Sequence, residues 1–174
     1  MSAGRAQALR PPSRVPYVAV VGASQASAHE LQVAEMVGRG LAQGGAVVIT
    51  GGRGGVMAAA SRGAQEAGGM TVGILPGTER AAANEWVTIA LPTGLGELRN
   101  GLIVRSADAV IAVGGAYGTL SEVALALSTG VAVLGIGTWR IDGIQPVGSS
   151  ADAVARALEL GRARVPATPA SRLD

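Results

Sequence analysis

The sequence contains no cysteine, no lysine and no phenylalanine, and His29 is its single histidine. Disulfides, thiol catalysis and cysteine-ligated zinc or iron–sulfur sites require cysteine, so they are excluded. The Schiff base of a pyridoxal phosphate enzyme such as a lysine decarboxylase, and the phosphate-binding lysine of a P-loop, are excluded as well. His29 has no partner at metal-ligand spacing, so we interpret it as a surface or helix-capping residue and expect no metal site.

Aromatic residues are also scarce, at 2% of 174 residues, whereas 48% are hydrophobic and 27 are glycine. The core must therefore be built from small and aliphatic side chains, which suits closely packed parallel strands and helices. The length fits one α/β domain. No apolar run approaches the roughly 18 residues of a membrane span, and residues 1–16 lack the apolar stretch of a signal peptide. We expect a cytoplasmic protein with no membrane partner.

Positive charge is concentrated at the two ends of the chain. The formal net charge is +2, but between residues 15 and 161 the 8 arginines are outnumbered by 11 acidic residues. The ends also lack the aromatic side chains that stack on bases, so we expect solvated tails and no nucleic-acid partner. The predicted organisation is a disordered basic tail (1–15), a single Rossmann-like nucleotide-binding domain (16–161) and a disordered C-terminal tail (162–174).

Short apolar runs alternate with helical patterns along the body of the chain, which is typical of βαβ units. This order predicts an α/β, Rossmann-like three-layer sandwich with a mostly parallel sheet of about six strands. The predicted strands are residues 17–21, 46–50, 71–75, 87–90, 109–113 and 131–135. The predicted helices are residues 28–43, 56–67, 95–106, 119–128 and 150–160.

Three of the predicted strands end in glycine-rich or small-residue loops, at Gly22, Gly51 and Gly114. Because the carboxyl ends of parallel strands lie at one edge of a sheet, we expect a ligand there. Residues 114–119 read GGAYGT, where backbone N–H groups and a helix N-terminus favour a phosphate. The alternative is a tight turn with Thr119 as a helix cap and no ligand. Three such loops at one edge favour a phosphate or nucleotide site.

A dinucleotide site fits the spacing poorly. The glycine pattern is G-G-x-x-G rather than G-x-G-x-x-G, and the strand over 46–50 ends in Ile49 and Thr50, where NAD binding requires an acidic residue. A dinucleotide is therefore a poor candidate for the ligand.

Two charged side chains near this edge are candidates for chemistry. Glu122 is predicted on the first turn of the helix beside the phosphate loop. There its carboxylate faces the ligand, complements the helix N-terminus or is exposed to water. Arg99, next to Asn100, is suited to grip a phosphate with its guanidinium, the alternative being a solvated helical arginine. Met57 and Trp86 are expected to be packing residues, and the loop of Trp86 is a candidate lid or partner surface.

The segments GGRGGVM (51–57), GILP (73–76) and GGAYGTLSE (114–122) resemble the LOG-like proteins, over about residues 18–141. This superfamily includes phosphoribohydrolases, which release a cytokinin base from its nucleoside 5′-monophosphate, and molybdenum cofactor carrier proteins of the same Rossmann-like fold. The resemblance implies that the protein is a homo-oligomer, either a dimer or a tetramer.

In the phosphoribohydrolases the signature is P-G-G-x-G-T-x-x-E with an upstream Arg-Lys pair. Residues 114–122 match its glycines, threonine and glutamate, and Arg99 matches its catalytic arginine. Val113 replaces the proline and Asn100 replaces the lysine. Together with residues 84–87 and 92–94, the Arg99–Asn100 pair resembles the small bacterial branch that is similar to the cofactor carriers.

The resemblance implies a phosphorylated nucleotide-type ligand and hydrolysis of the N-glycosidic bond of nucleoside 5′-monophosphates to free base and ribose 5-phosphate. The alternatives are a non-catalytic carrier of molybdenum cofactor, a phosphorylated pterin, and a nucleotide sensor; loss of the lysine favours the carrier. The hydrolytic interpretation makes Glu122 and Arg99 catalytic and requires no cofactor. The predicted ligand- or phosphate-binding residues are Gly22, Ser24, Gly51, Gly52, Gly55, Met57, Asn100, Gly114, Gly115, Tyr117, Gly118 and Thr119.

Overall fold

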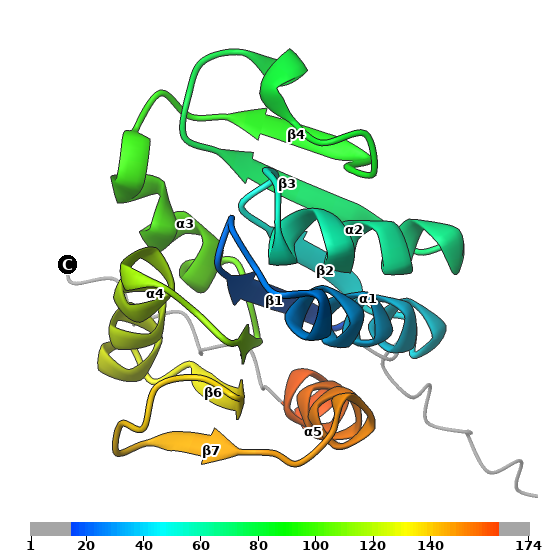
Figure 1. The fold of residues 1–174 in the computed structure, drawn as a ribbon, viewed down its shortest axis with the longest axis vertical. Coiled ribbons are helices and arrows are strands. Elements are labelled where there is room, and N and C mark those ends of the chain that lie inside the picture. Colours follow the sequence, from blue (N-terminus) through cyan, green and yellow to red (C-terminus); the bar gives the residue numbers. More distant parts are fainter. Residues whose placement is uncertain (1–14, 164–174) are drawn as a thin grey trace, which may run out of the picture.

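In the computed structural model, which describes residues 15–163, one seven-stranded parallel sheet lies between two layers of helices (Figure 1). The strand order is β4-β3-β2-β1-β5-β6-β7. The strands are β1 (Tyr17–Gly22), β2 (Val47–Thr50), β3 (Thr71–Leu75), β4 (Ile89–Pro92), β5 (Ala109–Val113), β6 (Ala132–Ile136) and β7 (Ile144–Pro146). The helices are α1 (Ala28–Gln43), α2 (Val56–Glu66), α3 (Asn100–Arg105), α4 (Tyr117–Ser128) and α5 (Ser150–Ala163), with 3-10 turns η1 (Arg80–Ala82) and η2 (Gly96–Arg99). The predicted α/β, Rossmann-like class is confirmed.

Both faces of the sheet are buried, and β1 shows how. Val18 and Val20 pack into the core shared with α1, α2 and α5, whereas Ala19 and Val21 pack into the core shared with α3 and α4. Figure 1 shows these two groups of helices on opposite sides of the sheet. A strand covered on both faces needs apolar residues at every position, which explains the continuous apolar runs in the sequence.

The structure differs from the sequence prediction at both edges of the sheet. The seventh strand, β7, has three residues and was not predicted; it is an edge strand, where Pro146 costs no ladder hydrogen bond. Strand β4 begins at Ile89 rather than at residue 87. Its four residues are all apolar but alternate between exposed and half-buried, because β4 is an edge strand.

Two helix boundaries also differ. The segment predicted as one helix over residues 95–106 consists of the 3-10 turn η2 followed by α3. Its start is not α-helical, because Gly94 (φ +67°) and Gly96 (φ +54°) lie outside the helical region. Helix α4 begins at Tyr117, two residues before the predicted start. Helix α5 extends to Ala163, past the predicted domain end. The predicted disorder of residues 1–14 and 164–174 lies outside the described residues.

The sheet order places a crevice at the carboxyl edge. From β1 the chain builds β2, β3 and β4 in one direction and then crosses over to β5 on the other side of β1. The connections that follow β1 and β5 therefore diverge, which is the arrangement where open α/β sheets bind ligands. No helix among residues 15–163 is both long and apolar enough to span a membrane.

Candidate functional site

A cavity of about 320 Å³ lies at this divergence. It is formed by the loops after β1, β2, β3 and β5, by η2 and the start of α3, and by the first turns of α4. The structure thus brings together the three strand ends that the sequence singled out. The lining residues are Gly22, Ala23, Ser24, Arg53, Met57, Pro76, Gly96, Glu97, Arg99, Asn100, Ala116, Gly118, Thr119 and Glu122.

Arg99 lines this cavity but is only 8% exposed. Its guanidinium lies against Gly51, where a Cβ would come within 2.6 Å of Nη2, so the absence of a side chain in the loop after β2 makes room for it. Within residues 15–163 its Nε and Nη1 atoms are buried without hydrogen-bond partners. Burial lowers the pKa of Arg99, while the carboxylate of Glu122 opposes the shift. Unpaired buried donors are costly, so a guanidinium in this state is suited to an anionic ligand.

Glu122 is buried as well, at 7% exposed. It lies on the second turn of α4 rather than on the first, because the helix begins at Tyr117. Its Oε1 lies 4.0 Å from Nη1 of Arg99, which is longer than a hydrogen bond. Burial raises the pKa of Glu122 to about 7, and the opposing effect of Arg99 is smaller. The alternative in which this carboxylate is exposed to water is therefore wrong.

The start of α4 is open to an anion. The N-cap is Ala116, with no side-chain cap, so the alternative in which Thr119 caps this helix is wrong. Thr119 is 2% exposed, and its Oγ1 has no hydrogen-bond partner in the described part of the chain. The first N–H groups of a helix have no partners within the helix. This terminus and the Thr119 hydroxyl therefore present donors to the same cavity as Arg99.

Asn100 links the two helices beside the cavity. Its Nδ2 donates to Oγ of Ser121 at 2.8 Å, and that hydroxyl donates to the carbonyl of Gly118 at 2.7 Å. The residue that replaces the lysine of the phosphoribohydrolases thus connects α3 to the first turn of α4. It brings no positive charge to the cavity.

The glycines of the predicted site bring the loops close together. A Cβ on Gly22 would lie 2.6 Å from the carbonyl oxygen of Val113, and one on Gly55 (φ +64°) would lie 2.6 Å from the carbonyl carbon of Ser24. Residues 51, 52, 114 and 115 are absent from the cavity lining and act through backbone shape. Tyr117 is 84% exposed, and its ring packs beside Trp139 with centroids 6.4 Å apart, so the structure does not place it in the cavity.

The sequence analysis missed several lining residues, of which Arg53 and Glu97 are charged. Arg53 is the single arginine within the GGRGG loop after β2, and this position among glycines could have identified it. Its positive charge acts on Arg99, whose pKa it helps to lower. Pro76 and Gly96 give no chemical signal in the sequence.

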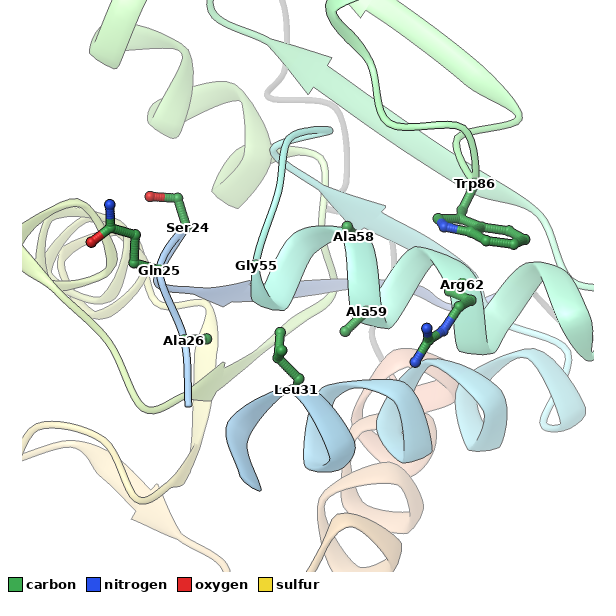
Figure 2. Close-up of a pocket in the computed structure, with 9 residues that line it drawn as sticks. All are labelled: Ser24, Gln25, Ala26, Leu31, Gly55, Ala58, Ala59, Arg62 and Trp86. Carbon is green, nitrogen blue, oxygen red and sulfur yellow. The ribbon is translucent and has the colours of Figure 1, made fainter. Parts of the chain in front are cut away.

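A second hollow, of about 400 Å³, adjoins the cavity and shares Ser24 with it. Figure 2 shows Trp86 and Arg62 on the two sides of α2, with Ser24 and Gln25 near the end where α2 begins. Trp86 thus lines a hollow, although the sequence suggested only packing. The lining residues are Ser24, Gln25, Ala26, Leu31, Gly55, Ala58, Ala59, Arg62 and Trp86.

His29 lies exposed on the first turn of α1, whose N-cap is Ser27. Among the residues that the structure describes, no group of three or more His, Asp or Glu side chains is placed to hold a metal ion.

Comparison with known proteins places these features in a family. A molybdenum cofactor binding protein from Rippkaea orientalis matches with a TM-score of 0.80 and 36% identity, over 84% of this chain and 98% of that one. The molybdenum cofactor carrier protein of Chlamydomonas reinhardtii matches with a TM-score of 0.78 and 34% identity, over the same shares. An uncharacterized protein of Archaeoglobus fulgidus is 43% identical over 113 residues, 65% of this chain and 74% of that protein.

These matches confirm the resemblance to LOG-like proteins, on the branch similar to the cofactor carriers. The model of the SLOG cluster4 family matches residues 15–162, nearly the whole described chain. The protein therefore belongs to the SLOG cluster4 family.

Proposed function

We propose that this protein is a non-catalytic binder and carrier of a phosphorylated pterin of the molybdenum cofactor type. The observation that carries the proposal is the buried guanidinium of Arg99 in a cavity at the switch point of the sheet; among the described residues, two of its nitrogen atoms have no hydrogen-bond partner. Phosphate oxygens accept hydrogen bonds and match a guanidinium in charge and shape. The uncapped start of α4 and the Thr119 hydroxyl add donors on another side of the cavity.

The carrier function is favoured over hydrolysis by what lies next to Arg99. Asn100 stands where the phosphoribohydrolases have lysine, and its amide donates to Ser121. The two solved relatives are a molybdenum cofactor binding protein and a molybdenum cofactor carrier protein. A carrier must bind the phosphate and protect the bound cofactor, and neither task requires a second cation beside Arg99.

Hydrolysis of nucleoside 5′-monophosphates is the second candidate, and Glu122 is the observation that favours it. A buried carboxyl with a pKa of about 7 exchanges its proton readily at neutral pH. In that reaction the bond between C1′ and the base breaks with its electron pair going to the base, while water attacks C1′ and gives one proton to the Glu122 carboxylate. The departing base takes up a proton from solvent. Arg99 and the start of α4 would hold the 5′-phosphate, a remote contact that positions the reacting bond.

The two candidates are separated by incubating the protein with a panel of nucleoside 5′-monophosphates, including an N6-prenylated AMP, and assaying ribose 5-phosphate. We expect no release, together with slower oxidative loss of added molybdenum cofactor, measured as its capacity to activate a cofactor-free molybdoenzyme. Glu122→Gln is expected to protect the cofactor as well as the wild type does. Release of ribose 5-phosphate that disappears in Glu122→Gln would instead establish the hydrolase.

Self-association is the second part of the proposal. Leu98 on η2 is 80% exposed, and Leu102 on α3 and Leu125 on α4 are also exposed, on two helices that pack against each other (Figure 1). Exposed apolar side chains on neighbouring elements are typical of an interface. We infer that a second copy of the chain covers these leucines. We also infer that the carrier works in the cytoplasm.

Sedimentation velocity tests this association. We expect the wild type to sediment as a dimer or tetramer and Leu98→Glu to sediment as a monomer, because a buried charge at the interface is costly. Met36→Glu, on the exposed side of α1, is the matched control and is expected to leave the assembly intact. A monomeric wild type would contradict the proposal.

A further inference from the structure

We propose that the hollow between Trp86 and Arg62 binds the planar ring system of the ligand, while the phosphate of the same molecule occupies the cavity of Arg99. This inference rests on the proposed function, because it requires a phosphorylated heterocycle. It goes beyond that function by assigning a binding site for the ring on the outer side of α2 and a preference for one kind of ring.

The two hollows meet at Ser24, which lines both of them. The second hollow, of about 400 Å³, falls within the range of small-molecule sites. With the phosphate at Arg99 and the ring beside α2, the ligand passes over Ser24.

The Trp86 side chain stands on a backbone that is fixed on both sides. The backbone N–H of Trp86 donates to Oδ1 of Asn84 at 3.1 Å, and the backbone carbonyl of Trp86 accepts from Oγ1 of Thr71 at 2.7 Å. Asn84 is itself tied to the loop after β2, donating from Nδ2 to the carbonyl of Arg53 and from its backbone N–H to that of Gly52, each at 2.9 Å. The indole is thus fixed relative to the loop that borders the phosphate cavity. A positioned, half-buried indole is suited to stack on a flat ring.

The floor of the hollow is apolar and is formed mostly by small side chains. Ala58 and Ala59 of α2 and Leu31 of α1 form it, so a flat ring can lie across the helix beside the indole (Figure 2). No charged group belongs to this part of the lining. The floor and Trp86 together favour a planar ring over a sugar or a flexible chain.

Arg62 gives the hollow a preference among rings. Its Nη2 donates to Oε2 of Glu35, while its buried Nε has no hydrogen-bond partner among the described residues. A guanidinium offers donors and no acceptor. It therefore favours a ring that carries an oxo group, such as the 4-oxo group of a pterin, over adenine, which presents an amino group at the corresponding edge.

Isothermal titration with two probes, neopterin monophosphate and ribose 5-phosphate, tests the site. Trp86→Ala is expected to lower the affinity for neopterin monophosphate by about 10- to 100-fold. Its affinity for ribose 5-phosphate is expected to stay within about twofold of the wild type, since stacking involves the ring alone. Trp139→Ala removes the second indole of the chain, which lies outside this hollow, and is expected to change neither affinity. Trp86→Phe keeps a ring in place and is expected to show an intermediate loss.

Fluorescence gives an independent readout, because the chain has two tryptophans. Neopterin monophosphate is expected to quench the emission of Trp139→Phe, in which Trp86 remains, and to leave that of Trp86→Phe unchanged. Arg62→Met is expected to abolish the preference for neopterin monophosphate over AMP, while Glu35 keeps Arg39 as a partner.

The outcomes separate the two proposals. Equal affinity of Trp86→Ala and the wild type for neopterin monophosphate, with no quenching through Trp86, would overturn the ring site and leave phosphate binding at Arg99 intact. Failure of the wild type to bind ribose 5-phosphate would overturn the proposed function itself.

Discussion

Replacing Arg99 by leucine is expected to weaken the binding of ribose 5-phosphate by about 30-fold or more. The side chain is buried, and within the described chain its Nε and Nη1 donate to no other group, so a bound phosphate would receive at least one charge-assisted hydrogen bond from it. Such bonds contribute about 1.5–3 kcal/mol each, or roughly 10- to 150-fold in affinity. Titration calorimetry at neutral pH gives the ratio directly.

Controls for this variant come from the same cavity and from α3, the helix that follows η2. Arg99→Lys keeps the charge but loses the planar fork, so an intermediate affinity is expected. Arg105→Leu removes an exposed arginine at the end of α3 and is expected to bind as the wild type does. Thr119→Val removes a hydroxyl that has no hydrogen-bond partner within residues 15–163. This variant is expected to be as stable as the wild type and to bind phosphate several-fold more weakly. Unchanged affinity in Arg99→Leu would show that the anion binds elsewhere.

Replacing Glu122 by glutamine is expected to stabilise the protein at pH 8.5 by up to about 3 kcal/mol relative to the wild type, and to leave stability nearly unchanged at pH 4.5. Burial raises the pKa of this carboxyl from 4.5 to about 7 in the folded state. Between these two values the folded chain holds a proton that the unfolded chain has lost. Wild-type stability from this group is therefore present below pH 4.5 and is lost as the pH rises through 7.

Urea unfolding across this pH range measures the difference between the two proteins. Glu159→Gln, which removes a surface partner of Arg156, is the matched control and is expected to differ from the wild type by a constant amount of less than about 1 kcal/mol. A stability difference for Glu122→Gln that stays flat between pH 4.5 and pH 8.5 would mean that the carboxyl titrates normally.

The central strands could be predicted because their signal is local. Strands β1, β2, β3, β5 and β6 are apolar runs that end near glycines or small residues, and these runs exist because helices cover both faces. The edge strand β7 gives no such signal, since three residues that include Pro146 show no pattern. The helix predicted over 95–106 was wrong at its start because Gly94, just before it, and Gly96, within it, both have positive φ.

The sequence predicted which residues form the candidate site, but it did not predict that these residues are buried or which residues they contact. The sequence placed Arg99, Glu122 and Thr119 near one sheet edge, but arginine and glutamate are usually exposed. The burial of Arg99 depends on Gly51, which leaves room for the guanidinium and lies almost 50 residues earlier in the chain. The bond from Asn100 to Ser121 and the hollow at Trp86 likewise join segments that are distant in sequence.

The position of β1 in the sheet has a consequence for synthesis. Its two neighbours are β2 and β5, and the hydrogen bond from the Tyr17 N–H to Asp108 spans 91 residues. At a synthesis rate of about 5–20 residues per second, one edge of this wholly apolar strand waits several seconds for its second partner. Until β5 and α4 leave the ribosome, the nascent chain has an unpaired hydrophobic edge and only half of the ligand cavity. A nascent chain halted after β4 is therefore expected to depend on chaperones and to bind no phosphate.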